Sequence, residues 1–190
     1  DSQNGLAYKL LGTAYAMFNH EDEAIRELTR ASEILPEDPE VHLNLGGVFM
    51  LQDMYESAAR CFRKVVEIDP MDRLGYANLA AAYDMDKKYD EEIQALKKIL
   101  MFTPEDIELR SALSTAYFNS ENYDEALTHA LCVIELDEKD PQAYCNLGSC
   151  YSAQNMTDEA IEAFKKATEI DPDYSLPHTN LGSLYATIGR

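Results

Sequence analysis

Four asparagines are the residues whose type and spacing best indicate a chemical role. Asn44, Asn78, Asn146 and Asn180 are separated by 34, 68 and 34 residues. Asparagine is only a moderate helix former, and its side-chain amide both donates and accepts hydrogen bonds. A regular row of amides can hold the backbone of an extended peptide without reading its sequence. The alternative is that these asparagines are solvated or bridge neighbouring helices.

The histidines, cysteines and carboxylates form no recognisable catalytic or metal-binding motif. The sequence contains no His-Glu-x-x-His, no Gly-x-Ser-x-Gly and no glycine-rich phosphate loop. Its four cysteines lack both Cys-x-x-Cys and zinc-finger spacing. We therefore expect no intrinsic catalysis, no metal and no cofactor. Unpaired cysteines favour a reducing compartment and hence a cytoplasmic location.

The formal net charge of −19 excludes several classes of partner. Nucleic acids and anionic membranes require Lys and Arg to neutralise phosphates, so both are poor partners. No apolar run is long enough to span a bilayer, so we expect no direct membrane insertion. A basic or neutral protein would be attracted, although the charge is equally explained as a self-repelling, soluble surface.

A pattern of leucine, small residue and aromatic residue recurs every 34 residues and defines the organisation of the chain. The six copies are Leu11-Gly12…Tyr15, Leu45-Gly46…Phe49, Leu79-Ala80…Tyr83, Leu113-Ser114…Tyr117, Leu147-Gly148…Tyr151 and Leu181-Gly182…Tyr185. A fixed period of this length is typical of solenoids, in which each repeat packs only on its neighbours. The 190 residues are therefore interpreted as a single domain.

The pattern resembles the tetratricopeptide repeat (TPR) family, in which each unit of 34 residues is a helix-turn-helix. With the small residue as position 8, the repeats are 5–38, 39–72, 73–106, 107–140, 141–174 and a partial 175–190. Position 20, usually alanine, departs from the family pattern at Glu92, and position 32, usually proline, departs at Glu138. The chain ends one helix into the sixth repeat, so we interpret it as a segment of a longer protein or a processed chain.

The resemblance implies an all-α, right-handed superhelical solenoid of antiparallel helix pairs, with a helix A and a helix B in each repeat. Helices are expected near residues 5–18, 21–34, 39–52, 55–68, 73–86, 89–102, 107–120, 123–136, 141–154, 157–170 and 175–188. Positions 8 and 20 are small because the two helices of a unit cross there at close range. Thr157 is a candidate N-cap.

In the resembled family, positions 2, 5, 6, 9, 12 and 13 of helix A line a concave groove, and the four asparagines occupy position 6. The first three repeats place apolar residues at positions 5, 12 and 13: Met17, Leu43, Met50, Leu51 and Met85. Later repeats place mostly polar residues at positions 5, 9, 12 and 13: Ser111, Thr115, Asn119, Ser149, Ser152, Ser183 and Thr187, with Phe118 as the apolar exception. This suits a partner with one hydrophobic anchor and an extended polar tail, unless the methionines instead pack neighbouring A helices.

One known TPR ligand type does not fit the sequence. A clamp for a C-terminal carboxylate needs two Lys, one Arg and two Asn. Lys9 and Asn44 match this set, but Thr13, Leu74 and Asn78 occupy the other three positions. The chain therefore lacks the positive charge that such a clamp requires.

The leading hypothesis is a protein-interaction scaffold that binds an extended peptide of a partner in the concave groove. The candidate peptide-binding residues are Asn44, Asn78, Asn146, Asn180, Leu43, Met50, Met85, Phe118 and Ser149. Two alternatives remain. The terminal helix, with Leu181, Leu184, Tyr185 and Ile188, could associate with a second copy to form a homo-oligomer. The chain could also be the substrate-recruiting arm of a larger enzyme.

Overall fold

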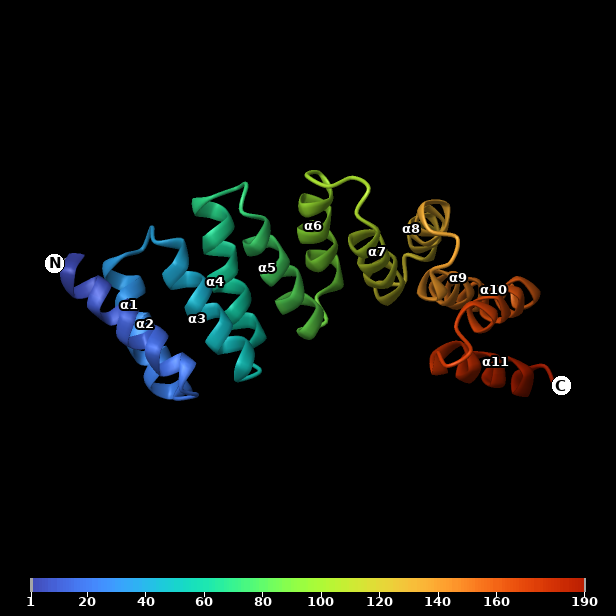
Figure 1. Cartoon of the computed structure of the whole chain (residues 1–190), viewed down its shortest axis with the longest axis horizontal. Coiled ribbons are helices and arrows are strands. Elements are labelled where there is room, and N and C mark those ends of the chain that lie inside the picture. The colour runs from blue at the N-terminus through green and yellow to red at the C-terminus, as the bar shows by residue number, and fades with distance from the viewer. Residues whose placement is uncertain (1, 190) are drawn as a thin grey trace. The chain divides into compact units, whose positions relative to one another are not determined.

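The computed structural model describes residues 2–189, which form eleven α-helices and no strands (Figure 1). The helices are α1 (Ser2–Met17), α2 (Glu21–Ile34), α3 (Pro39–Leu51), α4 (Tyr55–Ile68), α5 (Arg73–Met85), α6 (Tyr89–Leu100), α7 (Ile107–Asn119), α8 (Tyr123–Leu136), α9 (Pro141–Ala153), α10 (Thr157–Ile170) and α11 (Ser175–Thr187). The expected order of A and B helices is confirmed. The main differences are that α1 begins at Ser2 rather than residue 5 and that α6 ends two residues early.

The chain divides into two compact units, Asp1–Ala95 and Leu96–Arg190, with the boundary inside α6. In unit 1, α1 packs on α2, α3 on α4, and α4 on α5. In unit 2, α7 packs on α8, α8 on α9, α9 on α10, and α10 on α11. Within each unit every helix is thus covered by its neighbours in sequence, as a repeat array requires. That the chain is a single domain stays a prediction.

Small residues let the two helices of a repeat approach closely. A Cβ atom at Gly46 would lie 2.5 Å from Phe62 Cε1, and one at Gly148 would lie 2.7 Å from Phe164 Cδ1. The alanine at position 20 is fully buried in four repeats, at Ala24, Ala58, Ala126 and Ala160. The predicted close crossing of helices A and B is confirmed.

Aspartates precede the A helices α3, α5, α7 and α9 and satisfy their first free N–H groups. Asp38 accepts from Glu40 N, Asp72 from Gly75 N, and Asp106 from Leu109 N. The B helices α2, α4, α8 and α10 have no side-chain cap. The prediction that Thr157 is an N-cap is wrong, because α10 begins at Thr157 and its cap residue is Met156.

The turn from each helix A to its helix B has the same backbone form in five repeats. Position 15 has a left-handed φ of between 55° and 63°, at Asn19, Asp53, Lys87, Glu121 and Asn155. The next N–H returns to the carbonyl of the position-11 aromatic, for example from Asn122 N to Tyr117 O at 2.8 Å. This is the long bond of a Schellman motif, which satisfies the last carbonyls of helix A.

Candidate functional site

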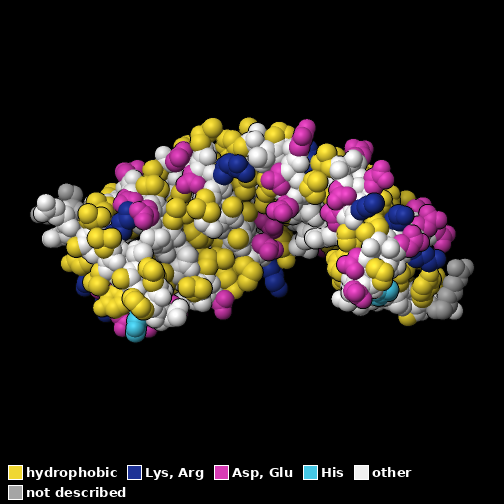
Figure 2. Space-filling model, viewed as in Figure 1, with side chains coloured by type: hydrophobic (Ala, Val, Ile, Leu, Met, Phe, Trp, Pro, Cys, Tyr) yellow, Lys and Arg dark blue, Asp and Glu magenta, His cyan; other side chains and the backbone are white. Residues whose placement is uncertain are grey.

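The A helices carry no net charge. Across α1, α3, α5, α7, α9 and α11 the charged residues are Lys9, Arg73, Arg110, Glu40, Asp84 and Glu108, three of each sign. The net charge of −19 is therefore carried entirely by the B helices and the connecting segments. Figure 2 shows broad hydrophobic patches over α1–α5 on its visible face, with Asp and Glu side chains at their margins. Taken together, the A helices thus offer a ligand a surface without net charge.

In unit 1, the two asparagines of the A helices differ in their partners. Asn44 Nδ2 donates to Thr13 Oγ1 at 2.9 Å and so joins α3 to α1. Asn78 is half-buried on α5 and makes no side-chain hydrogen bond within the described residues. The position equivalent to Thr13 in the preceding repeat is Gly47, which offers no hydroxyl. The amide of Asn78 is thus available to a ligand.

In unit 2, the two asparagines of the A helices also differ in their hydrogen-bond partners. Asn146 Nδ2 points at Thr115 Oγ1, at 3.5 Å, which is a long and weak hydrogen bond. Asn180 is half-buried on α11 and has no side-chain hydrogen bond among the described residues. Ser149, which stands where Thr115 stands one repeat earlier, instead donates to Cys145 O at 2.9 Å. Asn180 therefore also keeps its amide free.

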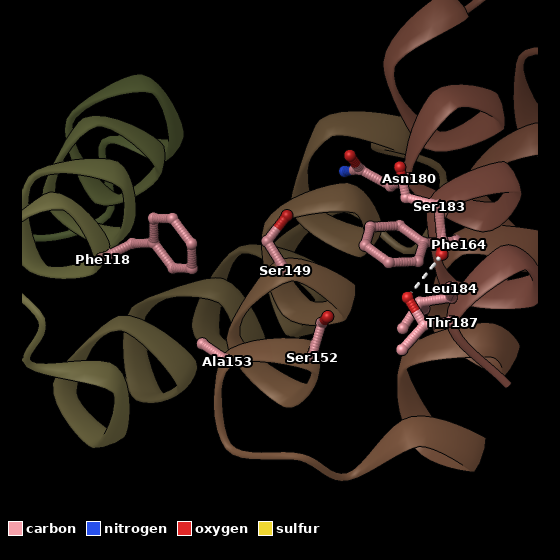
Figure 3. Close-up of a pocket in the computed structure, with 9 residues that line it drawn as sticks. All are labelled: Phe118, Ser149, Ser152, Ala153, Phe164, Asn180, Ser183, Leu184 and Thr187. Atoms are coloured by element: carbon pink, nitrogen blue, oxygen red, sulfur yellow. Dashed lines mark hydrogen bonds between the residues drawn. The ribbon is translucent and has the colours of Figure 1, made fainter.

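A pocket of about 320 Å³ in unit 2 brings three of the candidate residues together, namely Phe118, Ser149 and Asn180. The remaining lining residues are Ser152, Ala153, Phe164, Ser183, Leu184 and Thr187. Figure 3 shows Phe118 on one side, Asn180, Ser183, Leu184 and Thr187 on the other, and Ser149 and Ser152 between them. The size suits a side chain or a short stretch of peptide rather than a large ligand.

The polar groups of this pocket are only partly used within the protein. Thr187 Oγ1 donates to Ser183 O at 2.9 Å, which is a bond within α11. The hydroxyls of Ser152 and Ser183 and the amide of Asn180 make no hydrogen bonds in the part of the chain that the structure describes. Beside them, the ring of Phe118 is half-buried. The pocket thus offers free donors and acceptors next to one aromatic face.

The A helices of unit 1 present a different surface, which we call the apolar strip. It consists of exposed side chains at positions 2, 6 and 13 of α1, α3 and α5, which share one helical face: Leu6, Leu10, Met17, Leu51, Leu74 and Met85. Each of these side chains is at least 50% exposed. Of the predicted apolar contacts, Met85 belongs to the strip, whereas Leu43 and Met50 are half-buried beside it. The structure does not bring Met85 and Phe118 into one described site, since they belong to different units.

Glu92 is a carboxylate at a helix crossing where the other repeats have alanine. It is only 8% exposed, and its Oε2 has no hydrogen-bond partner. Burial, together with the nearby carboxylate of Asp84, raises the pKa of Glu92 to about 7. The group titrates near neutral pH, but it lies in the packing between helices and lines none of the surfaces described above.

The remaining titratable side chains have structural roles. His42 and His178 each bond the carbonyl oxygen six residues earlier, of Pro36 and Pro172, at 2.8 and 2.9 Å. The four cysteines are free, and burial raises the pKa of Cys150 to about 11.

Among the described residues, no group of three His, Cys, Asp or Glu side chains is placed to hold a metal ion. No described helix combines the length and apolar character needed to cross a bilayer.

Helix pairs that recur every 34 residues, A helices without net charge and repeated turn geometry define a helical-repeat protein. Two models of the tetratricopeptide repeat match the chain, over residues 19–83 and 141–174. The chain belongs to the tetratricopeptide repeat family. No curated protein sequence matches it.

Solved structures with the same fold share less than a quarter of their residues with this chain. The MamA protein superimposes with a TM-score of 0.78 at 23% identity, covering 92% of this chain and 96% of MamA. YrrB, a TPR protein with an unusual peptide-binding site, gives 0.79 at 20% identity, covering 95% and 93%. A MamA fragment from Desulfovibrio magneticus RS-1 gives 0.74 at 20% identity, covering 90% and 97%. At these identities the likeness establishes the fold alone.

Sequence reasoning missed part of the pocket and of the strip. Ser152, Ser183 and Thr187 are expected on the polar side of the groove but not among the peptide-binding residues, and the pocket lining adds Phe164. Leu6, Leu10 and Leu74 occupy positions 2 and 6 of the repeat, which line the groove in the resembled family. Their positions in the repeat are therefore the signal by which the sequence could have identified them. Their exposure in the structure is what separates them from core leucines.

Proposed function

We propose that the chain is a protein-interaction scaffold, without catalytic activity of its own, that binds an extended segment of a partner protein on its A helices. The observation that carries the proposal is the unit 2 pocket, where the amide of Asn180 and the hydroxyls of Ser152 and Ser183 have no protein partner. An extended peptide brings backbone N–H and C=O groups that need partners, and these three side chains supply both kinds. Phe118 supplies an apolar contact for one side chain.

Asn78 supports the same function in unit 1, because it is half-buried and unbonded on the A-helix face. YrrB, a TPR protein of the same fold, has an unusual peptide-binding site. The family membership and the neutral A helices both favour protein partners over nucleic acid. On this proposal Asn78 and Asn180 bind ligand, whereas Asn44 mainly joins helices.

The test compares the wild-type chain with an Asn78→Ala/Asn180→Ala variant. Partners are captured from the source cell, the bound segment is mapped by limited proteolysis, and the corresponding peptide is titrated by calorimetry. We expect the variant to bind about 1–3 kcal/mol more weakly, since each amide otherwise satisfies peptide backbone groups. A Gln94→Ala variant removes an exposed amide from a B helix and serves as the matched control. Equal affinity for all three proteins would refute the proposal.

A second candidate function, self-association, rests on α11. Pro177 is the only buried residue of α11, while Leu176 and Ile188 are exposed and Leu181, Leu184 and Tyr185 are half-buried. An uncovered apolar face at the end of an array can pack against another copy. Light scattering over a range of concentrations would show a dimer, and a Leu176→Gln/Ile188→Gln variant should then remain monomeric. A monomer at every concentration would exclude this candidate for the chain.

A further inference from the structure

The apolar strip has the dimensions of a helix-binding surface. Positions 2 and 13 of an α-helix lie about 16 Å apart along its axis, so the strip has two apolar edges. Leu6 and Leu74 lie on one edge, and Met17, Leu51 and Met85 lie on the other. An α-helix with its side chains is about 10–12 Å wide and spans most of this distance. A single extended strand is narrower and would leave one edge uncovered.

Between the two edges, position 6 carries Leu10, Asn44 and Asn78, whereas position 9 carries smaller side chains. Position 9 is Thr13, Gly47 and Ala81 in the three A helices. A Cβ atom at Gly47 would meet no other atom within 4 Å, so the space above this residue is open. The small residues at position 9 of α3 and α5 leave room for the side chains of a bound helix, and Leu10 on α1 adds an apolar contact between the edges.

The charges around the strip indicate which charge the partner should carry outside its apolar face. Unit 1 contains nine Lys and Arg against nineteen Asp and Glu, a net charge of −10. The strip itself is neutral, and the charges of Lys9 and Glu40 beside it are paired at 2.5 Å. The turns at the N-terminal ends of α3 and α5 contain four carboxylates and no Lys or Arg: Glu37, Asp38, Asp69 and Asp72. Glu37 and Asp38 form ion pairs with Lys64 and Lys9, whereas Asp69 and Asp72 form none among the described residues. A basic flank would be attracted to this edge, and an acidic flank would be repelled.

We propose that the apolar strip of unit 1 binds an amphipathic helix of a partner protein, with Leu- or Met-type side chains on the strip and Lys or Arg residues towards the acidic turns. The inference rests on the proposed function in one respect, that A helices form the binding face. It differs in the conformation of the bound segment: the extended segment of the proposed function would occupy the pocket of unit 2, whereas the strip of unit 1 would bind a helix. Apolar contact supplies the affinity, and the charged flank supplies orientation and attraction over distance.

The test uses the full chain and a fluorescent helical peptide of about 18 residues, with Leu and Met on one face and Lys on the other. Fluorescence anisotropy measures its affinity beside that of a scrambled peptide of the same composition and of a version with Glu in place of Lys. We expect the scrambled and Glu peptides to bind at least about 10-fold more weakly, because each loses one of the two complementary faces.

The matching protein variant is Met17→Gln/Leu51→Gln/Met85→Gln. These side chains are exposed, so we expect the fold to be retained and peptide affinity to fall at least about 10-fold. The control is Met101→Gln/Leu131→Gln/Leu136→Gln, which removes three exposed apolar side chains from unit 2 and should change affinity by less than about 2-fold. Equal losses in both variants, or equal binding of the Lys and Glu peptides, would overturn the inference. The two proposals fail separately, because the strip variant keeps all four asparagines and the asparagine variant keeps the strip.

Discussion

Asn44 donates a hydrogen bond of 2.9 Å to Thr13 Oγ1, and the Thr13 hydroxyl in turn donates to Lys9 O at 2.8 Å. The residue at position 9 therefore decides the role of the asparagine that follows it by 31 residues. Thr13 engages Asn44 within the protein, whereas Gly47 cannot engage Asn78. Asparagines at the same position of the repeat thus have different roles: Asn44 joins two helices, whereas the amide of Asn78 is available to a ligand.

The first prediction concerns these two asparagines of unit 1. Asn44→Ala should lower the free energy of unfolding by about 1 kcal/mol, because it removes a bond between α3 and α1. Asn78→Ala should leave stability unchanged within about 0.5 kcal/mol, because it removes no intramolecular bond. Urea denaturation followed by circular dichroism measures both. A larger loss in Asn78→Ala than in Asn44→Ala would contradict the assignment.

The second prediction uses two glycines of A helices. Gly148→Ala places a Cβ 2.7 Å from Phe164 Cδ1, so overpacking should lower the free energy of unfolding by about 1–3 kcal/mol. Gly47→Ala meets no atom within 4 Å and should raise it by up to about 1 kcal/mol through helix propensity. Thermal unfolding of the two variants should shift in opposite directions. The close-crossing explanation fails if both variants are stabilised.

The third prediction concerns the pH dependence that Glu92 creates. Its pKa is raised from 4.5 to about 7 in the folded chain, so the folded state binds the proton more tightly than the unfolded state. The stability that this group contributes is present below pH 4.5 and is lost as the pH rises through about 7. The loss is about 3 kcal/mol when the carboxylate becomes charged in its buried position.

Glu92→Gln isolates this effect, since the amide has nearly the same shape and does not titrate. Urea denaturation at a series of pH values from about 4.5 to 8 should show the variant gaining stability relative to wild type as the pH rises. The control is Glu91→Gln, an exposed neighbour on the same helix, which should run parallel to wild type. A constant difference between Glu92→Gln and wild type would show that Glu92 does not have the raised pKa.

The fourth prediction concerns the left-handed turn residue of the fourth repeat. Glu121 has a φ of 63°, a conformation that costs an ordinary L-residue about 1–2 kcal/mol. Glycine relieves this cost but makes the unfolded chain more flexible, so Glu121→Gly should raise the free energy of unfolding by about 0.5 kcal/mol. Glu138→Gly, at an exposed loop position without positive φ, should lower it. Differential scanning calorimetry should therefore show a higher unfolding temperature than wild type for Glu121→Gly and a lower one for Glu138→Gly.

The fold was predictable because each repeat signals it locally. Small residues lie at the helix crossings of most repeats, and aspartates precede α3, α5, α7 and α9 at equivalent positions. The early end of α6 was not predicted. In the third repeat Phe102 N bonds Ile99 O, three residues back, so the last turn tightens before the loop that contains Pro104.

The candidate site was predictable only in outline. Phe118, Ser149 and Asn180 were expected on the groove side of their helices, and they do line one pocket. The sequence could not show that Ser149 is already bonded to Cys145 O, because a serine hydroxyl chooses between its own helix and its neighbour by small differences in geometry. Nor could it show which leucines are exposed, since α3 contains both a buried leucine, Leu45, and an exposed one, Leu51.

The neutral A helices within an acidic chain also have a kinetic consequence. Coulomb attraction from the B helices and turns acts before contact, so it changes how often a basic partner arrives. Once the partner is bound, its contacts with the apolar strip and with the unit 2 pocket are with uncharged groups, so its residence time depends mainly on apolar burial and hydrogen bonds. Added salt should therefore slow association and leave dissociation nearly unchanged. Release would then have to come from competition or from a change in the partner, rather than from ionic conditions.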